Sequence, residues 1–309
     1  MISRRISLLI VAAALAWIQN VDAQTTPPFQ WVNRLPERAH PALRHRTFES
    51  TIVGEKVGYV VLLPPGYDDT SRRYPVVYYL HGGRPGSETK GTGIAPSIVE
   101  VQRQAELPPT IYVFVNGGPI SHYNVPPSNP PHQAGTVGAD VFIRELIPHV
   151  DATYRTIADR RSRGLEGFSQ GGRGTMRLAL RHRDLFATAA AGGGGYATEK
   201  RISENDGFEN PKLRFADGDN TWDLARRYAS EEGEPVQFLI YVGTKGFNYE
   251  NNLQYMRFLD SLGIKHDRIV VPGVKHSARR IYEQSAEAIM RHHASHLRGD
   301  DQVRSVDPD

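Results

Sequence analysis

Apolar runs alternate with amphipathic segments along most of the chain. Four runs are almost continuously apolar, as is typical of strands buried on both faces of a sheet: residues 76–80, 110–115, 185–191 and 236–242. Segments with helical periodicity lie between and after them: residues 94–107, 137–154, 171–182, 221–230 and 278–297. This alternation of strand and helix predicts an α/β fold whose central sheet is mostly parallel.

Two regions depart from this alternation. Residues 47–52 and 57–63 alternate between apolar and polar positions on either side of Gly54, which indicates an antiparallel hairpin ahead of the parallel strands. Residues 196–219 are the least regular part of the chain, and we expect them to form a flap.

The N-terminus has the three parts of a secretory signal peptide. Arg4 and Arg5 precede a short apolar segment, and Val21-Asp22-Ala23 supplies the small residues of a cleavage site. The apolar segment is too short for a comfortable transmembrane span. We therefore expect residues 1–23 to be removed, and the mature chain to be secreted or periplasmic with no membrane association.

Three regions are expected after the signal peptide. A proline-rich extended arm comes first, one folded domain follows, and a charged tail is predicted to be disordered; these regions are residues 24–44, 45–297 and 298–309.

Composition excludes several kinds of chemistry. The 309-residue chain contains no cysteine, so it has no disulfide, no thiolate nucleophile and no zinc–thiolate site. The net charge is only +3 and no basic block is interleaved with aromatic residues, so nucleic acid is not an expected partner.

The strongest chemical motif is the pentapeptide Gly167-Phe168-Ser169-Gln170-Gly171. It follows a predicted strand and opens a predicted helix, which is the setting of a nucleophile elbow. We therefore predict Ser169 as a nucleophile. The backbone N–H of Gln170 is one expected oxyanion donor, and the N–H of Gly83 or Arg84, in the glycine turn after residue 80, is the other.

His276 is the predicted general base. A histidine with an ordinary pKa near 6.5 is suited to take the proton of a serine hydroxyl at neutral pH. In α/β-hydrolases the histidine follows the last strand, and His276 lies five residues beyond Val271 at that place. Of the other histidines, we expect His292, His293 and His296 to lie on a solvated helix face.

The third member of the expected triad is a carboxylate after residue 242. Glu250 is the nearest one, and its side chain is predicted to reach back to the His276 ring. A plain favourable charge at a helix N-terminus is the alternative interpretation of Glu250. Three aspartates of the irregular region remain open as alternatives: Asp217, Asp219 and Asp223.

Four segments in this order resemble the putative-esterase branch of the α/β-hydrolases, which includes esterase D, feruloyl, acetylxylan and enterochelin esterases. They are residues 74–83, 144–157, 166–172 and 271–276. The resemblance covers roughly residues 45–297. It implies an α/β-hydrolase fold with a mostly parallel sheet of about eight strands and helices on both faces.

The resemblance also implies an activity. A member of this branch is expected to be a serine esterase that works through an acyl-enzyme with no metal and no cofactor. Its expected substrates are small-molecule or oligosaccharide esters of the feruloyl or acetyl type. Because Tyr123, Tyr196 and Trp222 lie on or beside predicted loops, they are candidates to line an aromatic acyl pocket. The departure from the family pattern is Gly246, which stands at the usual position of the acid. An acyltransferase, a peptidase, or a homologue that binds carbohydrate or a siderophore with weakened catalysis remain the alternatives.

Overall fold

The computed structural model describes residues 29–104, 106–126, 137–210 and 213–300. The predicted signal peptide at residues 1–23 lies outside these ranges. Residues 24–28 of the arm predicted at residues 24–44 and residues 301–309 of the tail predicted at residues 298–309 lie outside them as well.

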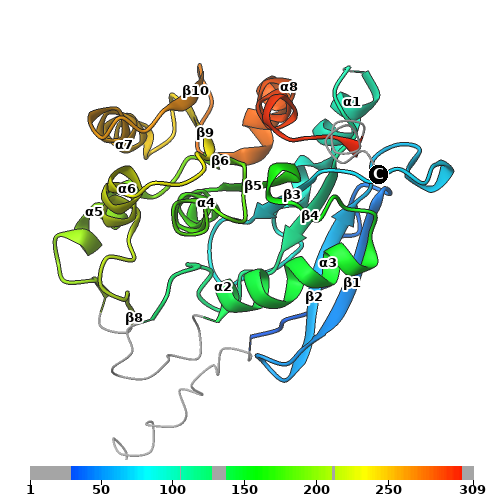
Figure 1. The fold of residues 1–309 in the computed structure, drawn as a ribbon, viewed down its shortest axis with the longest axis horizontal. Coiled ribbons are helices and arrows are strands. Elements are labelled where there is room, and N and C mark those ends of the chain that lie inside the picture. Colours follow the sequence, from blue (N-terminus) through cyan, green and yellow to red (C-terminus); the bar gives the residue numbers. More distant parts are fainter. Residues whose placement is uncertain (1–28, 105, 127–136, 211–212, 301–309) are drawn as a thin grey trace, which may run out of the picture.

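The centre of the structure is a sheet of eight strands in the order β1-β2-β4-β3-β5-β6-β9-β10 (Figure 1). Its strands are β1 (Leu43–Ser50), β2 (Glu55–Leu62), β3 (Val76–Leu80), β4 (Ile111–Val115), β5 (Arg163–Phe168), β6 (Thr188–Gly192), β9 (Gln237–Gly243) and β10 (His266–Val271). β1 pairs antiparallel with β2, and β2 antiparallel with β4, whereas all other neighbours are parallel. The predicted hairpin and mostly parallel sheet are confirmed.

Helices cover both faces of this sheet (Figure 1). They are α1 (Ala95–Gln104), α2 (Gly138–Asp140), α3 (Ile147–Thr153), α4 (Gln170–Arg181), α5 (Tyr196–Ser203), α6 (Thr221–Ser230), α7 (Tyr249–Ser261) and α8 (Ala278–His296). α1 and α8 share one face, and α3 and α4 lie on the other. The chain between α2 and α3, Val141–Leu146, is π-helical, so the single helix predicted at residues 137–154 is three consecutive helical pieces.

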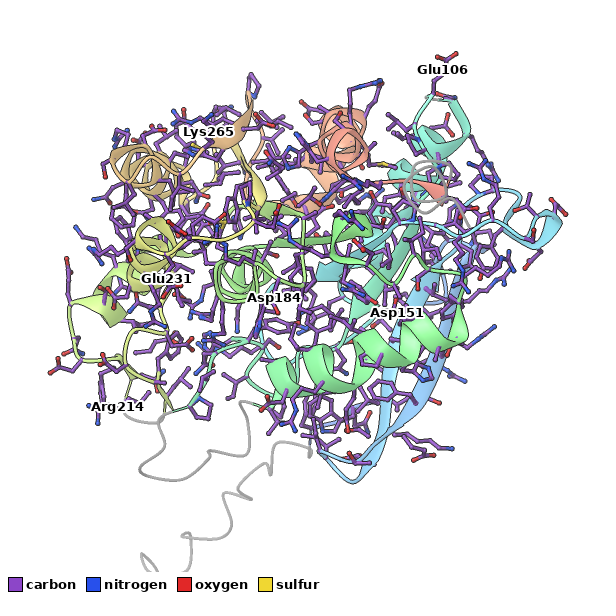
Figure 2. The ribbon with its side chains drawn as sticks, viewed as in Figure 1. Glu106, Asp151, Asp184, Arg214, Glu231 and Lys265 are labelled. Carbon is purple, nitrogen blue, oxygen red and sulfur yellow. The ribbon has the colours of Figure 1, made fainter. Side chains whose placement is uncertain are left out.

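β3 and β4 are apolar throughout because each of these strands supplies side chains to two cores. On β3 and β4, Tyr78 and Val113 face the core under α3 and α4, while Val77 and Tyr112 face the core under α1 and α8. This is the period of two expected for a strand covered on both sides. Side chains fill the space between sheet and helices, and charged ends such as those of Glu106 and Arg214 project from the periphery (Figure 2).

The prediction of an irregular flap at residues 196–219 is wrong. This segment contains α5 and a short antiparallel pair, β7 (Phe208–Asn210) with β8 (Leu213–Arg214). Glu199 on α5 is fully buried and forms ion pairs with Arg173 and Arg177 on α4. The polar composition that suggested a loop therefore comes partly from charges that neutralise each other inside the protein.

Three aromatic residues expected at the site belong to the core instead. Tyr123, Tyr196 and Trp222 are each at most 5% exposed. Tyr196 stacks on Tyr255 with ring centroids 3.9 Å apart, and the indole Nε1 of Trp222 donates to the Tyr196 carbonyl at 3.0 Å. Their position in sequence near loops did not reveal that Tyr196 and Trp222 pack against Tyr255 of α7, or that the Tyr123 ring lies against Gly174 of α4.

Two of the three histidines of α8 also differ from expectation, whereas His296 is exposed as predicted. His292 and His293 are buried, because this face of α8 packs against the sheet rather than facing solvent. Nδ1 of His293 lies 2.7 Å from Oγ1 of Thr188 on β6. Burial is the main cause that lowers the pKa of His292 to about 4, so this ring is neutral at physiological pH.

Removal of the buried Glu199 carboxylate should strongly destabilise the protein. In Glu199→Ala the guanidinium groups of Arg173 and Arg177 would lose their shared partner, a change that costs about 3–5 kcal/mol when a buried ion pair is broken. Glu204→Ala, which removes only an exposed pair with Lys200, should cost less than about 1 kcal/mol. Urea unfolding measures both, and equally small losses would contradict the role assigned to Glu199.

Candidate active site

Ser169 sits on a strained turn between the end of β5 and the start of α4. Its backbone has φ 62° and ψ −116°, a conformation that non-glycine residues rarely adopt. The neighbouring backbone is so close that a Cβ on Gly171 would lie 2.0 Å from the Leu80 carbonyl oxygen. A Cβ on Gly167 would lie 2.6 Å from the Gly171 carbonyl oxygen. The strand–turn–helix setting predicted for Ser169 is therefore present, and glycine is required on both sides of it.

His276 meets Ser169 across 107 positions of sequence. Its Nε2 lies 2.8 Å from Oγ of Ser169, within hydrogen-bond distance. His276 reaches the serine from the loop between β10 and α8, at the same carboxyl edge of the sheet where β5 ends. The structure thus brings together the two residues predicted as nucleophile and base.

Aromatic rings and a glycine surround the His276 imidazole. The ring centroids of Phe168 and Phe247 lie 4.7 Å and 4.4 Å from that of His276. The backbone of Gly193 also comes close, since a Cβ there would be 3.2 Å from Cε1 of His276. Burial lowers the pKa of His276 from its usual value of 6.5, so the neutral ring that can accept a proton is favoured.

The predicted contact between Glu250 and His276 is absent. Nδ1 of His276 is buried and has no hydrogen-bond partner among the residues that the structure describes. Glu250 is exposed in the first turn of α7, so the interpretation as a favourable charge at a helix N-terminus fits it better. Gly246 lies beside the histidine instead, and a Cβ built on it would be 3.7 Å from the His276 backbone nitrogen.

The alternative acids are also away from His276. Asp217 is exposed, and none of the ion pairs of the described residues joins it to the histidine. Asp219 accepts a hydrogen bond from the Val125 N–H at 2.6 Å and pairs with Arg181, and Asp223 accepts one from the Ser203 hydroxyl at 2.7 Å. Both aspartates therefore hold α6 and its surroundings in place.

Backbone donors for an oxyanion lie next to Ser169. Gln170 is the first residue of α4, where an N–H has no partner within the helix and the helix dipole favours negative charge. On the other side, a Cβ on Gly82 would be 3.0 Å from Cβ of Ser169, so the turn that carries Gly83 borders the serine. Gly83 has φ 73°, which glycine adopts without strain.

His81 holds this turn in shape, a role that sequence reasoning missed. Burial is the main cause that lowers the pKa of His81 to about 4, so the ring is neutral and one nitrogen can accept. That nitrogen, Nε2, accepts hydrogen bonds from the N–H groups of Ser87 at 3.2 Å and Gly117 at 3.3 Å. His81 thereby joins the glycine turn to the loop that follows β4.

A cavity of about 310 Å³ opens at the Ser169–His276 pair. Apolar atoms of Ile94 and Phe168 form part of its wall, and the charged residues that line it, Lys90 and Arg279, are both cationic. Tyr123, Tyr196 and Trp222 are not among its lining residues, so the predicted aromatic acyl pocket is not formed by them. Lys90 and Arg279 were not expected at the site.

Two further searches of the described residues bear on the kind of protein. No group of three or more His, Asp or Glu side chains within them is placed to hold a metal ion. Among the helices formed by these same residues, none has both the length and the apolar character needed to cross a bilayer.

Comparison with known sequences points to esterases. A family model described as "Putative esterase" matches residues 50–258. Esterase Rv1288 of Mycobacterium tuberculosis is 26% identical over 259 residues, which cover 75% of this chain and 55% of the relative. An endo-1,4-beta-xylanase/feruloyl esterase of Xylanibacter ruminicola is 29% identical over 175 residues, 52% of this chain and 23% of that protein. The chain thus spans about half the length of Esterase Rv1288, and its match covers 23% of the endo-1,4-beta-xylanase/feruloyl esterase.

Solved structures share the fold. A ferulic acid esterase superposes with a TM-score of 0.64 at 20% identity, over 82% of this chain and 98% of the other. An S-formylglutathione hydrolase from Agrobacterium tumefaciens gives a TM-score of 0.64 at 15% identity, over 83% and 95% of the two chains. These neighbours confirm the α/β-hydrolase fold, and the family match extends over more than half of the sequence. The chain therefore belongs to the putative-esterase family.

Proposed function

We propose that this protein is a serine esterase that hydrolyses carboxylic esters through an acyl-enzyme on Ser169. The observation that carries the proposal is the 2.8 Å contact between His276 Nε2 and the hydroxyl of a serine held on a strained elbow. A serine hydroxyl becomes nucleophilic when an adjacent base can take its proton. Membership of an esterase family supports the same reaction.

The proposed reaction has two halves. Ser169 Oγ attacks the ester carbonyl while its proton moves to Nε2 of His276, and the N–H groups of Gln170 and Gly83 donate to the developing oxyanion. The carbonyl–oxygen bond to the alcohol then breaks, and the alcohol leaves with the proton from His276. In the second half, water gives its proton to His276 and attacks the acyl-enzyme, which releases the acid and restores Ser169.

The proposed substrates are feruloyl or acetyl esters of carbohydrate. Relatives and structural neighbours named as feruloyl or ferulic acid esterases support this class. The cavity of about 310 Å³ lies at the lower end of the range for pockets that bind small molecules, which suits one acyl group better than a long chain. The signal peptide proposed for residues 1–23 would deliver the enzyme to the periplasm or the medium, where such polymers occur.

Replacement of the nucleophile should abolish both turnover and labelling. Ser169→Ala is expected to lower kcat on p-nitrophenyl acetate by about ten-thousandfold or more and to prevent modification by a fluorophosphonate probe. Ser261→Ala is a matched control, because this exposed hydroxyl donates only to the Phe258 carbonyl of its own helix. A wild-type protein that is neither active nor labelled would favour a binding protein instead.

Activity should persist at mildly acidic pH. The base is active only when neutral, so kcat/KM falls as pH drops through the pKa of His276, and burial lowers this pKa from 6.5. The half-maximal point of the acid limb is therefore expected below pH 6.5 in a profile measured with p-nitrophenyl acetate. An acid limb centred above pH 7 would contradict the environment assigned to this ring.

Substrate preference is testable with one panel. Methyl ferulate, acetylated xylan oligosaccharides, long-chain p-nitrophenyl esters, a thioester and an amide are compared by kcat/KM. We expect the feruloyl or acetyl substrates to exceed the long-chain ester by about tenfold or more, because extra methylenes that do not fit a pocket each lose binding free energy. Preference for the long-chain ester or the amide would contradict the proposed class.

A further inference from the structure

Among the residues that the structure describes, no carboxylate pairs with the side of His276 that faces away from Ser169. In a serine–histidine–acid triad the acid accepts from Nδ1, fixes the tautomer and orientation of the ring, and stabilises the imidazolium. Here Nδ1 is buried and has no hydrogen-bond partner, and no carboxylate oxygen lies within ion-pair distance of the ring, among the residues described. The charged side chains that share the His276 cavity, Lys90 and Arg279, have the opposite sign.

Aromatic contacts hold the His276 ring. Phe168 is the last residue of β5 and is 7% exposed. Its ring is part of the core and contacts the ring of His276. Phe247 lies on the loop between β9 and α7 and contacts the same ring at 4.4 Å between centroids. Its side chain is 81% exposed, the most exposed large apolar residue described. An aromatic ring left this open to water has no role in the core, and its contact is with the histidine.

We infer that His276 works without a carboxylate partner and that Phe247 is the positioning residue that takes over the orienting part of the acid's role. This inference rests on the proposed esterase function. Aromatic contacts restrict the rotation of the imidazole and keep its Nε2 on Ser169, but they offer no negative charge to an imidazolium. The expected enzyme is slower than one with a complete triad, and its base stays neutral to lower pH.

The position of Gly246 makes the inference testable by a gain of activity. A Cβ there would meet the Gly243 carbonyl oxygen at 3.1 Å and Oδ1 of Asn248 at 3.3 Å, so a side chain requires these two neighbours to shift by a few tenths of an ångström. The backbone of Gly246 is not in the left-handed region, so it does not require glycine. A Cβ at position 246 would lie 3.7 Å from the backbone nitrogen of His276, so an aspartate here would start beside the histidine.

The first experiment compares Gly246→Asp with Gly246→Asn, which has the same size and no charge. On p-nitrophenyl acetate, Gly246→Asp is expected to raise kcat at least about tenfold over Gly246→Asn, because loss of this acid in a complete triad costs about ten-thousandfold. The acid limb of its pH profile is expected to move to higher pH, since a nearby carboxylate favours the imidazolium. Both variants are checked for folding by circular dichroism and thermal unfolding.

The second experiment tests Phe247 itself. Phe247→Ala should lower kcat about tenfold or more with little change in KM, and Phe247→Tyr should retain most of the activity because its ring is kept. Phe208→Ala is the matched control, since Phe208 is also exposed, at 40%, but lies on β7. A rise in KM alone would make Phe247 a substrate contact and overturn its positioning role.

Two results would overturn the inference that His276 works without a carboxylate partner. One is a folded Gly246→Asp variant with the rate and acid limb of Gly246→Asn. The other is a loss of kcat of about a hundredfold or more in Glu250→Gln, which would show that Glu250 reaches His276 during turnover. Failure of the esterase proposal can be distinguished from these two results. In that case the wild-type protein would neither hydrolyse p-nitrophenyl acetate nor react with a fluorophosphonate.

Discussion

The strained turn at Ser169 is the constraint on which the site depends. Its positive φ is sustained because β3, β5 and α4 approach so closely that Gly167 and Gly171 leave no room for a Cβ. The same close approach places the first N–H groups of α4 beside Ser169 and sets the glycine turn after β3 against it. Nucleophile and oxyanion donors therefore come from one local arrangement of backbone.

The histidine depends on long-range topology instead. Parallel strands all end at the same edge of the sheet, so the loop after β10 arrives beside the turn after β5 although 107 positions separate the two residues. The loop after β9 shares this edge, and it brings Phe247 to the His276 ring. In this protein aromatic rings contact the imidazole, and burial lowers its pKa and so favours its neutral form.

Much of the architecture was predictable because the physical signal is local. Continuous apolar runs such as residues 76–80 identify strands with a core on each side, and a glycine-flanked serine between strand and helix identifies the elbow. Other features depend on partners distant in sequence. Glu199 is buried because Arg177, 22 positions earlier, meets it on another helix, and His293 is buried because that face of α8 packs on β6. The separation of Glu250 from His276 likewise depends on the path of a loop, which spacing does not determine.

The proposed chemistry depends on a covalent bond to one oxygen atom, and mass spectrometry can locate it directly. Trypsin should release the peptide of residues 164–173, in which Ser169 is the only hydroxyl-bearing residue. After reaction with a fluorophosphonate, or after rapid acid quench during turnover of an ester, we predict that this peptide alone carries the added mass. Modification of a different peptide, in a protein that turns over esters, would contradict the assignment of Ser169 as nucleophile.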